Sequence, residues 1–302
     1  MKNKLKGSIY LLLATVIWGS AFVSQSIGMD HIGPFTFQAA RCFLAVISLL
    51  PIILIADLFK KDGKHFFSRW NDKALWKAGI LCGIPLFIAT NLQQIGLVET
   101  DAGKSGFLTA MYIVIVPILG IFLKRKPGIM VPISVVVAVV GLYFLSCMGT
   151  TQISGSDLVT LCCALMFAVQ ITFVDLFAMD TDPLRLNAIQ ALVCTVLSSV
   201  AMLFAEQPTW EGIRSCAIPL AHTGILSLGI AYCLQIMGQK HLDSTPAALI
   251  MSLESVFAVI FGVLILKETM TGWEIFGCIL LFAAVILSQI PIKSKNKETV
   301  HP

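Results

Sequence analysis

Long apolar runs alternate with short polar segments along nearly the whole chain. Each run holds about 20 residues with few charges, the length with which a helix crosses the hydrocarbon core of a bilayer. The pattern predicts ten membrane-spanning helices, at roughly 5–27, 33–57, 74–97, 103–123, 129–148, 156–178, 184–205, 217–238, 245–266 and 272–291. Little chain is left between the runs, so we expect an all-α polytopic membrane protein without a soluble domain.

The amino-acid composition argues against a soluble domain, a nucleic-acid-binding protein and a metal-binding protein. Hydrophobic residues make up 57% of the 302 residues and charged residues 13%, whereas soluble domains carry about 25% charged residues. The net charge of +4 is small, and Lys and Arg are scattered, which argues against a nucleic-acid partner. The nine cysteines form no C-x-x-C pair, so we expect small hydrophobic side chains and no metal site.

The basic residues predict an orientation. If the ten spans are correct, 17 Lys and Arg lie on one side of the membrane and three lie on the other, with Arg41 inside a span. Cytoplasmic loops carry the excess of positive charge. We therefore expect a multi-pass protein of the cell membrane, with both termini and the 58–73 linker in the cytoplasm and the 149–155 loop outside.

The chain also contains an internal repeat. A shift of 142 residues gives ten identities in the 38 positions 86–123, and a shift near 149 aligns Pro34 with Pro183. The matched residues include Ile88, Ala89, Leu92, Gln93 and Gly96 with Ile230, Ala231, Leu234, Gln235 and Gly238. The chain thus divides into two five-helix halves, 1–148 and 149–302, that form one transport unit. Five is odd, so the halves should be inverted, as in many secondary transporters.

Several segments carry a family resemblance. The W-G motif at 18–23, Pro34 followed by Arg41, and the segment 253–268 with its Leu-Glu start resemble the EamA-type carriers of the drug/metabolite transporter superfamily. The resemblance implies a ten-helix bundle with a central cavity, alternating access, and transport of small molecules, often export of amino acids or other metabolites. Ser255 departs from the pattern, because many members have Pro there.

Polar and aromatic side chains within spans are candidates for the transport pathway, because polar groups are costly in a membrane and tend to face a cavity. The candidates are Trp18, Phe22, Gln25, Arg41, Asn91, Tyr112, Gln170, Gln190, Tyr232 and Glu254. A packing or hydrogen-bonding role remains open for each. In the third span, Asn91 and Gln94 share a face while Gln93 and its repeat mate Gln235 face elsewhere. We expect at least one of these amides to join helices rather than to bind substrate.

Two charged candidates stand apart. Arg41 lies roughly 10 Å into its span and keeps its charge, so it either binds a substrate carboxylate, snorkels to the interface or makes a structural ion pair. Glu254 lies about 14 Å into the ninth span, near the membrane centre. It is our candidate coupling group, a carboxyl that gains and loses a proton; the alternatives are a structural hydrogen bond, a pair with Arg41 or a site for a cationic substrate.

We therefore expect a secondary active transporter of small metabolites such as amino acids, with export as the favoured direction. Import of a cationic nutrient, bound by aromatic rings and Glu254, is the alternative. An enzyme or a channel is a weaker one, because the chain lacks catalytic motifs, a phosphate loop and a filter loop. We expect no cofactor beyond a coupled proton, and as partners a small solute and the lipid bilayer; a homodimer remains open.

Overall fold

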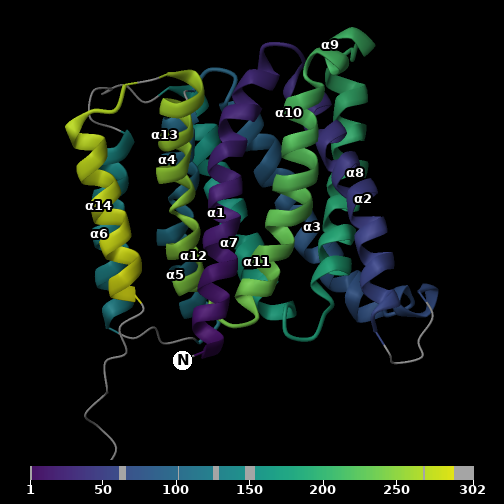
Figure 1. Ribbon diagram of the computed structural model, residues 1–302, viewed down its shortest axis with the longest axis horizontal. Helices are drawn as coiled ribbons and strands as arrows, with labels where there is room; N and C mark the ends of the chain where they lie inside the picture. Colours follow the sequence, from purple (N-terminus) through teal and green to yellow (C-terminus); the bar gives the residue numbers. More distant parts are fainter. Residues whose placement is uncertain are drawn as a thin grey trace, which may run out of the picture.

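The computed structural model describes residues 2–60, 66–100, 102–124, 129–146, 154–267 and 269–288, which form helices and connecting turns without a strand (Figure 1). The elements are α1 (Lys2–Met29), α2 (Pro34–Leu58), η1 (Phe67–Trp70), α3 (Lys73–Gly96), α4 (Ala102–Ala110), α5 (Tyr112–Phe122), α6 (Met130–Ser146), α7 (Gly155–Phe177), α8 (Pro183–Ala205), α9 (Trp210–Ser215), α10 (Ala217–Ala221), η2 (His222–Ala231), α11 (Tyr232–Gln239), α12 (Ser244–Met251), α13 (Glu254–Phe261), η3 (Gly262–Leu266) and α14 (Gly272–Ser288). All ten predicted segments are helical.

Eight helical stretches in the described part of the chain are long and apolar enough to cross a membrane. They correspond to the first four predicted spans and to the sixth through the ninth. The fifth and tenth segments are the helices α6 and α14, each of 17 residues. The chain is thus a polytopic helical membrane protein, and the count of ten crossings stays a prediction. Parts of the predicted loops, at 61–65 and 147–153, and the C-terminal tail lie outside the described residues.

Helices from the two halves of the sequence pack against each other throughout the bundle. At one edge α6 contacts α14, and toward the other edge α2 contacts α8, while α1, α3 and α7 lie in the middle (Figure 1). In the centre α1 also packs on α13 and α11, and α3 packs on α7 and α8. Segments about 140 residues apart therefore lie side by side.

Glycine allows two of these close contacts. A Cβ atom on Gly19 of α1 would lie 2.3 Å from Phe257 Cβ of α13, and one on Gly277 of α14 would lie 2.6 Å from the carbonyl oxygen of Gly141 in α6. Any larger residue would push these helices apart, since small residues are what allow backbones to approach within membranes. The contact at Gly19 brings the helix that carries Trp18 onto the helix that begins at Glu254.

Two long spans are interrupted at equivalent positions of the repeat. Helix α4 ends at Ala110 and α5 begins at Tyr112, and α12 ends at Met251 while α13 begins at Glu254. At both interruptions the backbone makes tighter bonds between residues three apart, for instance from Val114 N to the Met111 carbonyl. These irregular turns place Tyr112 and Glu254 where their side chains meet. The π-helical segment η2 likewise ends directly before a cavity residue, Tyr232. Such π-helical distortions are frequent at functional sites.

Candidate functional site

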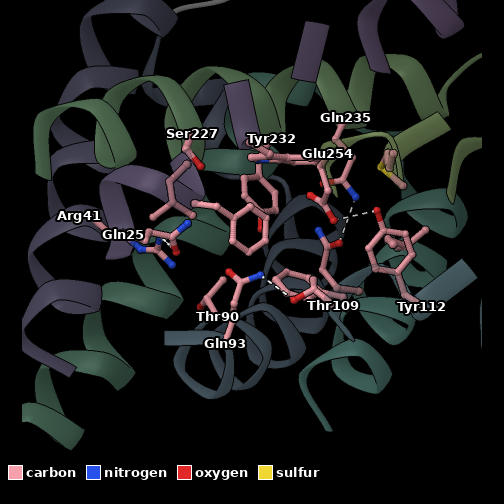
Figure 2. A pocket seen from close by; sticks show the side chains of 17 residues that line it. Gln25, Arg41, Thr90, Gln93, Thr109, Tyr112, Ser227, Tyr232, Gln235 and Glu254 are labelled. Carbon is pink, nitrogen blue, oxygen red and sulfur yellow. Dashed lines mark hydrogen bonds between the residues drawn. The ribbon is translucent and has the colours of Figure 1, made fainter. Parts of the chain in front are cut away.

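A cavity lies at the centre of the bundle (Figure 2). It is bordered by residues from both halves of the chain. The lining residues are Trp18, Phe22, Gln25, Arg41, Thr90, Gln93, Thr109, Tyr112, Phe167, Gln170, Ile171, Ser227, Leu228, Tyr232, Gln235, Met251 and Glu254. A cavity between helices that combines apolar side chains with a few polar groups is the usual location of a small-molecule site.

One face of α1 forms an aromatic wall of the cavity. Trp18, Phe22 and Gln25 lie at helical spacings of four and three residues, and all three line the cavity, as their shared face predicts. The rings of Trp18 and Tyr232 meet edge to face, with centroids 5.1 Å apart. The indole Nε1 of Trp18 is buried and finds no hydrogen-bond partner among the residues that the structure describes, so this wall offers a donor.

Arg41 lies in a neutral, hydrogen-bonded pocket. The residue is 2% exposed; its Nε donates to Oε1 of Gln38 at 2.6 Å and its Nη1 donates to Oε1 of Gln25. The guanidinium lies over the ring of Phe37, 5.7 Å from the centroid. In the part of the chain that the structure describes, no carboxylate pairs with Arg41. Its charge is therefore held by amides and left without a counterion.

Glu254 places a buried carboxyl group on the other side of the cavity. It is 6% exposed, and the hydroxyl of Tyr112 donates to its Oε1 at 3.0 Å. Figure 2 shows Arg41 and Gln25 on one side and Glu254 and Tyr112 on the other, with Tyr232 between them. The hypothesis of an Arg41–Glu254 pair is therefore wrong for this conformation.

A chain of amides lies beside the cavity and joins three helices. Gln235 of α11 donates through Nε2 to Gln170 of α7 at 3.1 Å and to Gln239 at 3.0 Å. Gln170 donates to Gln190 of α8 at 3.4 Å, and Gln190 donates to Asn187 at 2.8 Å. The Oε1 of Gln235 is buried and accepts from no donor in the described ranges, and Gln235 lines the cavity. The series of linked amides therefore ends in an available acceptor at Gln235.

The cavity brings together eight of the ten residues predicted for the pathway, and Asn91 and Gln190 are not among its lining residues. Asn91 instead donates to Oγ of Ser198 at 2.9 Å and to the carbonyl of Phe87 at 2.8 Å. Gln190 lies behind Gln170 in the amide chain. Their amides join helices, which is the alternative that remained open for both residues.

Gln93 and Gln235, which were not among the predicted pathway residues, both line the cavity. Gln93 also donates to Oγ1 of Thr109 at 3.2 Å, so contact with the cavity and contact between helices do not exclude one another. Both glutamines belong to the matched positions of the repeat, and that identity was the signal that could have located them. The other lining residues that the sequence analysis missed are Thr90, Thr109, Phe167, Ile171, Ser227, Leu228 and Met251. Most are small or apolar and carry no signal of their own.

Comparison with known proteins identifies membrane transporters. The model of the EamA-like transporter family matches residues 5–147 and again 155–289. An uncharacterized transporter of Archaeoglobus fulgidus is 30% identical over 296 residues, which cover 96% of this chain and 88% of that protein. The uncharacterized inner membrane transporter YicL of Salmonella typhimurium is 22% identical, over 98% of this chain and 99% of its own length.

A solved crystal structure shares the fold. It superimposes with a TM-score of 0.77 at 15% sequence identity, and the match covers 94% of this chain and 96% of that one. Among the described residues, no group of three or more His, Cys, Asp or Glu side chains is placed to hold a metal ion.

Proposed function

Because the chain belongs to the EamA-like transporter family, we propose that it exports small metabolites, amino acids or related compounds, by alternating access. Its relatives support a membrane transporter; the class of substrate, the direction and the mechanism are our proposal. One observation carries it. A cavity lies within the bundle, lined by side chains of both halves, and it holds two buried ionisable groups, Arg41 and Glu254, that pair with no oppositely charged group in the described part of the chain.

The inverted repeat supplies the mechanical part of the proposal. The lining residues include mates that are 142 residues apart, Gln93 with Gln235 and Tyr112 with Glu254, and the second pair is joined by a hydrogen bond between the two halves of the sequence. Equivalent helices also pack together, α2 with α8 and α6 with α14. Two halves of one fold that meet in this way can exchange conformations, which would open the cavity to each side in turn.

Glu254 is the coupling group in this proposal. As the buried carboxyl of the cavity, it can be neutral with a bound proton or ionised and hydrogen-bonded to Tyr112. Opening to the outside would let a proton bind, and opening to the cytoplasm would release it. An inward proton gradient would then drive solute outward. The orientation follows the positive-inside rule, with the N-terminus and the 58–73 linker in the cytoplasm.

Purified protein in liposomes tests the transport proposal. We expect saturable movement of amino acids or related metabolites that depends on a pH gradient. Glu254→Gln keeps the shape and the hydrogen bond from Tyr112, so it should fold, lose gradient-driven accumulation and keep exchange. Glu211→Gln, an exposed site on α9, serves as the control. Wild-type pH dependence in Glu254→Gln would remove the coupling role, and fast, unsaturable ion flux would indicate a channel.

Cysteine labelling tests the orientation without reference to the substrate. Single cysteines at residues 64, 152 and 297 of a cysteine-free variant are exposed to an impermeant thiol reagent in intact cells. We expect the reagent to label position 152 alone. Labelling at 64 or 297 but not at 152 would overturn the topology and the division into two inverted halves.

A further inference from the structure

The two buried charges of the cavity point to the shape of its substrate. We propose that the cavity binds a zwitterion whose carboxylate and ammonium groups lie at opposite ends of an apolar spacer, as in an ω-amino acid. The carboxylate would lie at Arg41 and the ammonium at Glu254. This inference rests on the proposed transport function and narrows its substrate class.

The Arg41 side of the cavity presents hydrogen-bond donors. A guanidinium has five N–H groups, and the contacts of Arg41 to Gln25 and Gln38 use two of them. Both partners are neutral, so the positive charge remains uncompensated in a residue that is 2% exposed. A buried charge without a counterion is costly, and a planar carboxylate is the group that a guanidinium fork binds best.

The Glu254 side presents acceptors. Tyr112 donates to Oε1 of Glu254, and in the described part of the chain no donor reaches Oε2. The Oε1 atom of Gln235, a residue 1% exposed, is buried without a partner, and Figure 2 shows Gln235 on the same side as Glu254. An ammonium group is a cation with three donors and no acceptor. It would satisfy both oxygen atoms and neutralise the carboxylate.

The region between these two sides is aromatic and apolar. Tyr232 lies between Arg41 and Glu254 in Figure 2, and the ring of Trp18 packs on it. Phe22 and Leu228 also line the cavity. Such a lining favours methylene groups or a ring over further charges. In a compact α-amino acid the two charged groups share one carbon atom, so it could reach only one of the two sides at a time.

A single zwitterion of suitable length would pair with both groups at once, whereas a cation leaves Arg41 without a counterion and an anion leaves Glu254 to be neutralised by a proton. The ammonium also competes with a proton for the same carboxylate of Glu254. A proton that enters from outside would therefore displace the bound solute, which agrees with export against a proton gradient.

Ligand binding to the full chain in detergent tests this inference, with affinity measured from the shift of thermal unfolding. The probes are glycine, 4-aminobutanoate, 6-aminohexanoate and 8-aminooctanoate, with hexanoate and hexylamine as half-analogues that lack one charge. We expect the best ω-amino acid to bind about tenfold or more tightly than glycine and than either half-analogue, since each lost charged hydrogen bond costs about that factor. Glycine binding as tightly as the longer zwitterions would overturn the inference.

Variants assign the two ends. Glu254→Gln should remove the preference for 6-aminohexanoate over hexanoate, and Arg41→Gln should remove its preference over hexylamine. Ser198→Ala, which alters a buried contact of Asn91 away from the lining residues, should keep both preferences. If Arg41→Gln does not fold, Arg41→Lys and the probe series on the wild-type protein still decide. A preference that survives at either end in the corresponding variant contradicts the assignment.

The two proposals fail in different ways. If liposomes show gradient-driven transport of other metabolites while none of the ω-amino acids binds, the transport function stands and this inference falls. If hexylamine binds as tightly as 6-aminohexanoate, the cavity is a cation site and the carboxylate assignment is wrong. If no solute is transported, the proposed function fails whatever the cavity binds.

Discussion

Helices α2 and α8 are joined at both ends, and the two junctions use different chemistry. At one end, Asp57 near the end of α2 forms an ion pair with Arg185 in the first turn of α8. At the other end, Glu206 just after α8 accepts hydrogen bonds from the backbone N–H groups of Phe35 at 2.9 Å and Thr36 at 2.8 Å, and from the Thr36 hydroxyl at 2.5 Å. Asp57 and Glu206 are equivalent under the 149-residue shift, yet one binds a side chain and the other a helix terminus.

The helix caps explain the difference. Helix α8 begins after Asp182, whose own side chain accepts from the N–H groups of Leu184 and Arg185. Helix α2 begins after Gly33, which has no side chain to offer. Because helix N-terminal N–H groups need acceptors, Glu206 caps α2 from the neighbouring helix. The cap at α8 is already supplied by Asp182, so Asp57 is left to neutralise Arg185.

The two junctions should therefore respond differently to substitution, and each forms one end of a helix pair that alternating access would have to open. The Asp57 junction, made of Asp57, Lys60, Asp182 and Arg185, is a network of side-chain charges. The Glu206 junction depends on one carboxylate and on backbone groups that substitution does not remove. Three predictions separate them.

The largest effect is expected from Asp57→Asn. Arg185 is 2% exposed, and its remaining carboxylate, Asp182, is 3.4 Å away and partly exposed. Breaking a buried pair on one side leaves an uncompensated charge, so we expect a loss of about 3 kcal/mol in the free energy of unfolding in detergent. The double variant Asp57→Asn with Arg185→Gln should recover much of that loss. Additive losses in the double variant would show that the two residues are not coupled.

Much of the fold was predictable from the sequence. Runs of apolar residues located the eight long apolar helical stretches within a few residues, because a span in lipid must bury its own backbone hydrogen bonds over a fixed length. The interruptions at Met111 and at Ser252–Leu253 were not predicted. Proline does not mark the first of them, because α5 continues through Pro117. Tertiary packing decides such local irregularities.

The candidate site was predictable in its residue types more than in its contacts. Trp18, Phe22 and Gln25 followed from helical spacing, because one face of a helix has one set of neighbours. Gln93 lines the cavity where Asn91 was predicted to do so, since the rotation of α3 about its axis depends on which neighbours it packs against. The free donors of Arg41 and the free acceptor of Gln235 are properties of the assembled bundle. No single segment of sequence contains them.

A second, smaller effect is expected at the Glu206 junction. Glu206→Gln removes the charge at the N-terminus of α2 but keeps one acceptor, so we expect a loss of about 1–2 kcal/mol in unfolding free energy. Gly33→Ala should act on the same contact, because its Cβ atom would lie 2.3 Å from Cδ of Glu206. The control is Glu211→Gln on the exposed surface of α9.

The double variant Gly33→Ala with Glu206→Gln sharpens this prediction. If both single changes act by displacing the cap, their losses should overlap and the double variant should lose less than their total. Strictly additive losses would mean that Gly33 is needed for another reason and that Glu206 does not cap α2 alone.

The smallest effect concerns Lys60, at the exposed rim of the Asp57 junction. Lys60 donates to Oδ2 of Asp182 at 2.6 Å, but its side chain is 37% exposed, so Lys60→Met should cost only about 0.5–1 kcal/mol at neutral pH.

Burial raises the pKa of Asp182, but the Lys60 ammonium and the backbone N–H of Arg185 outweigh it and hold the pKa below its ordinary value of 3.8. A carboxyl whose pKa is lower in the folded state stabilises that state above its ordinary pKa, and the contribution is lost as the pH falls through the lowered value. Unfolding measured from pH 7 downward should therefore show wild type and Lys60→Met converging below about pH 4, and high salt should reduce the difference at neutral pH because exposed pairs are screened. A gap that persisted at low pH and high salt would mean that Lys60 acts through packing of its methylene chain, and the Asp57 junction would then owe less to charge than its contacts indicate.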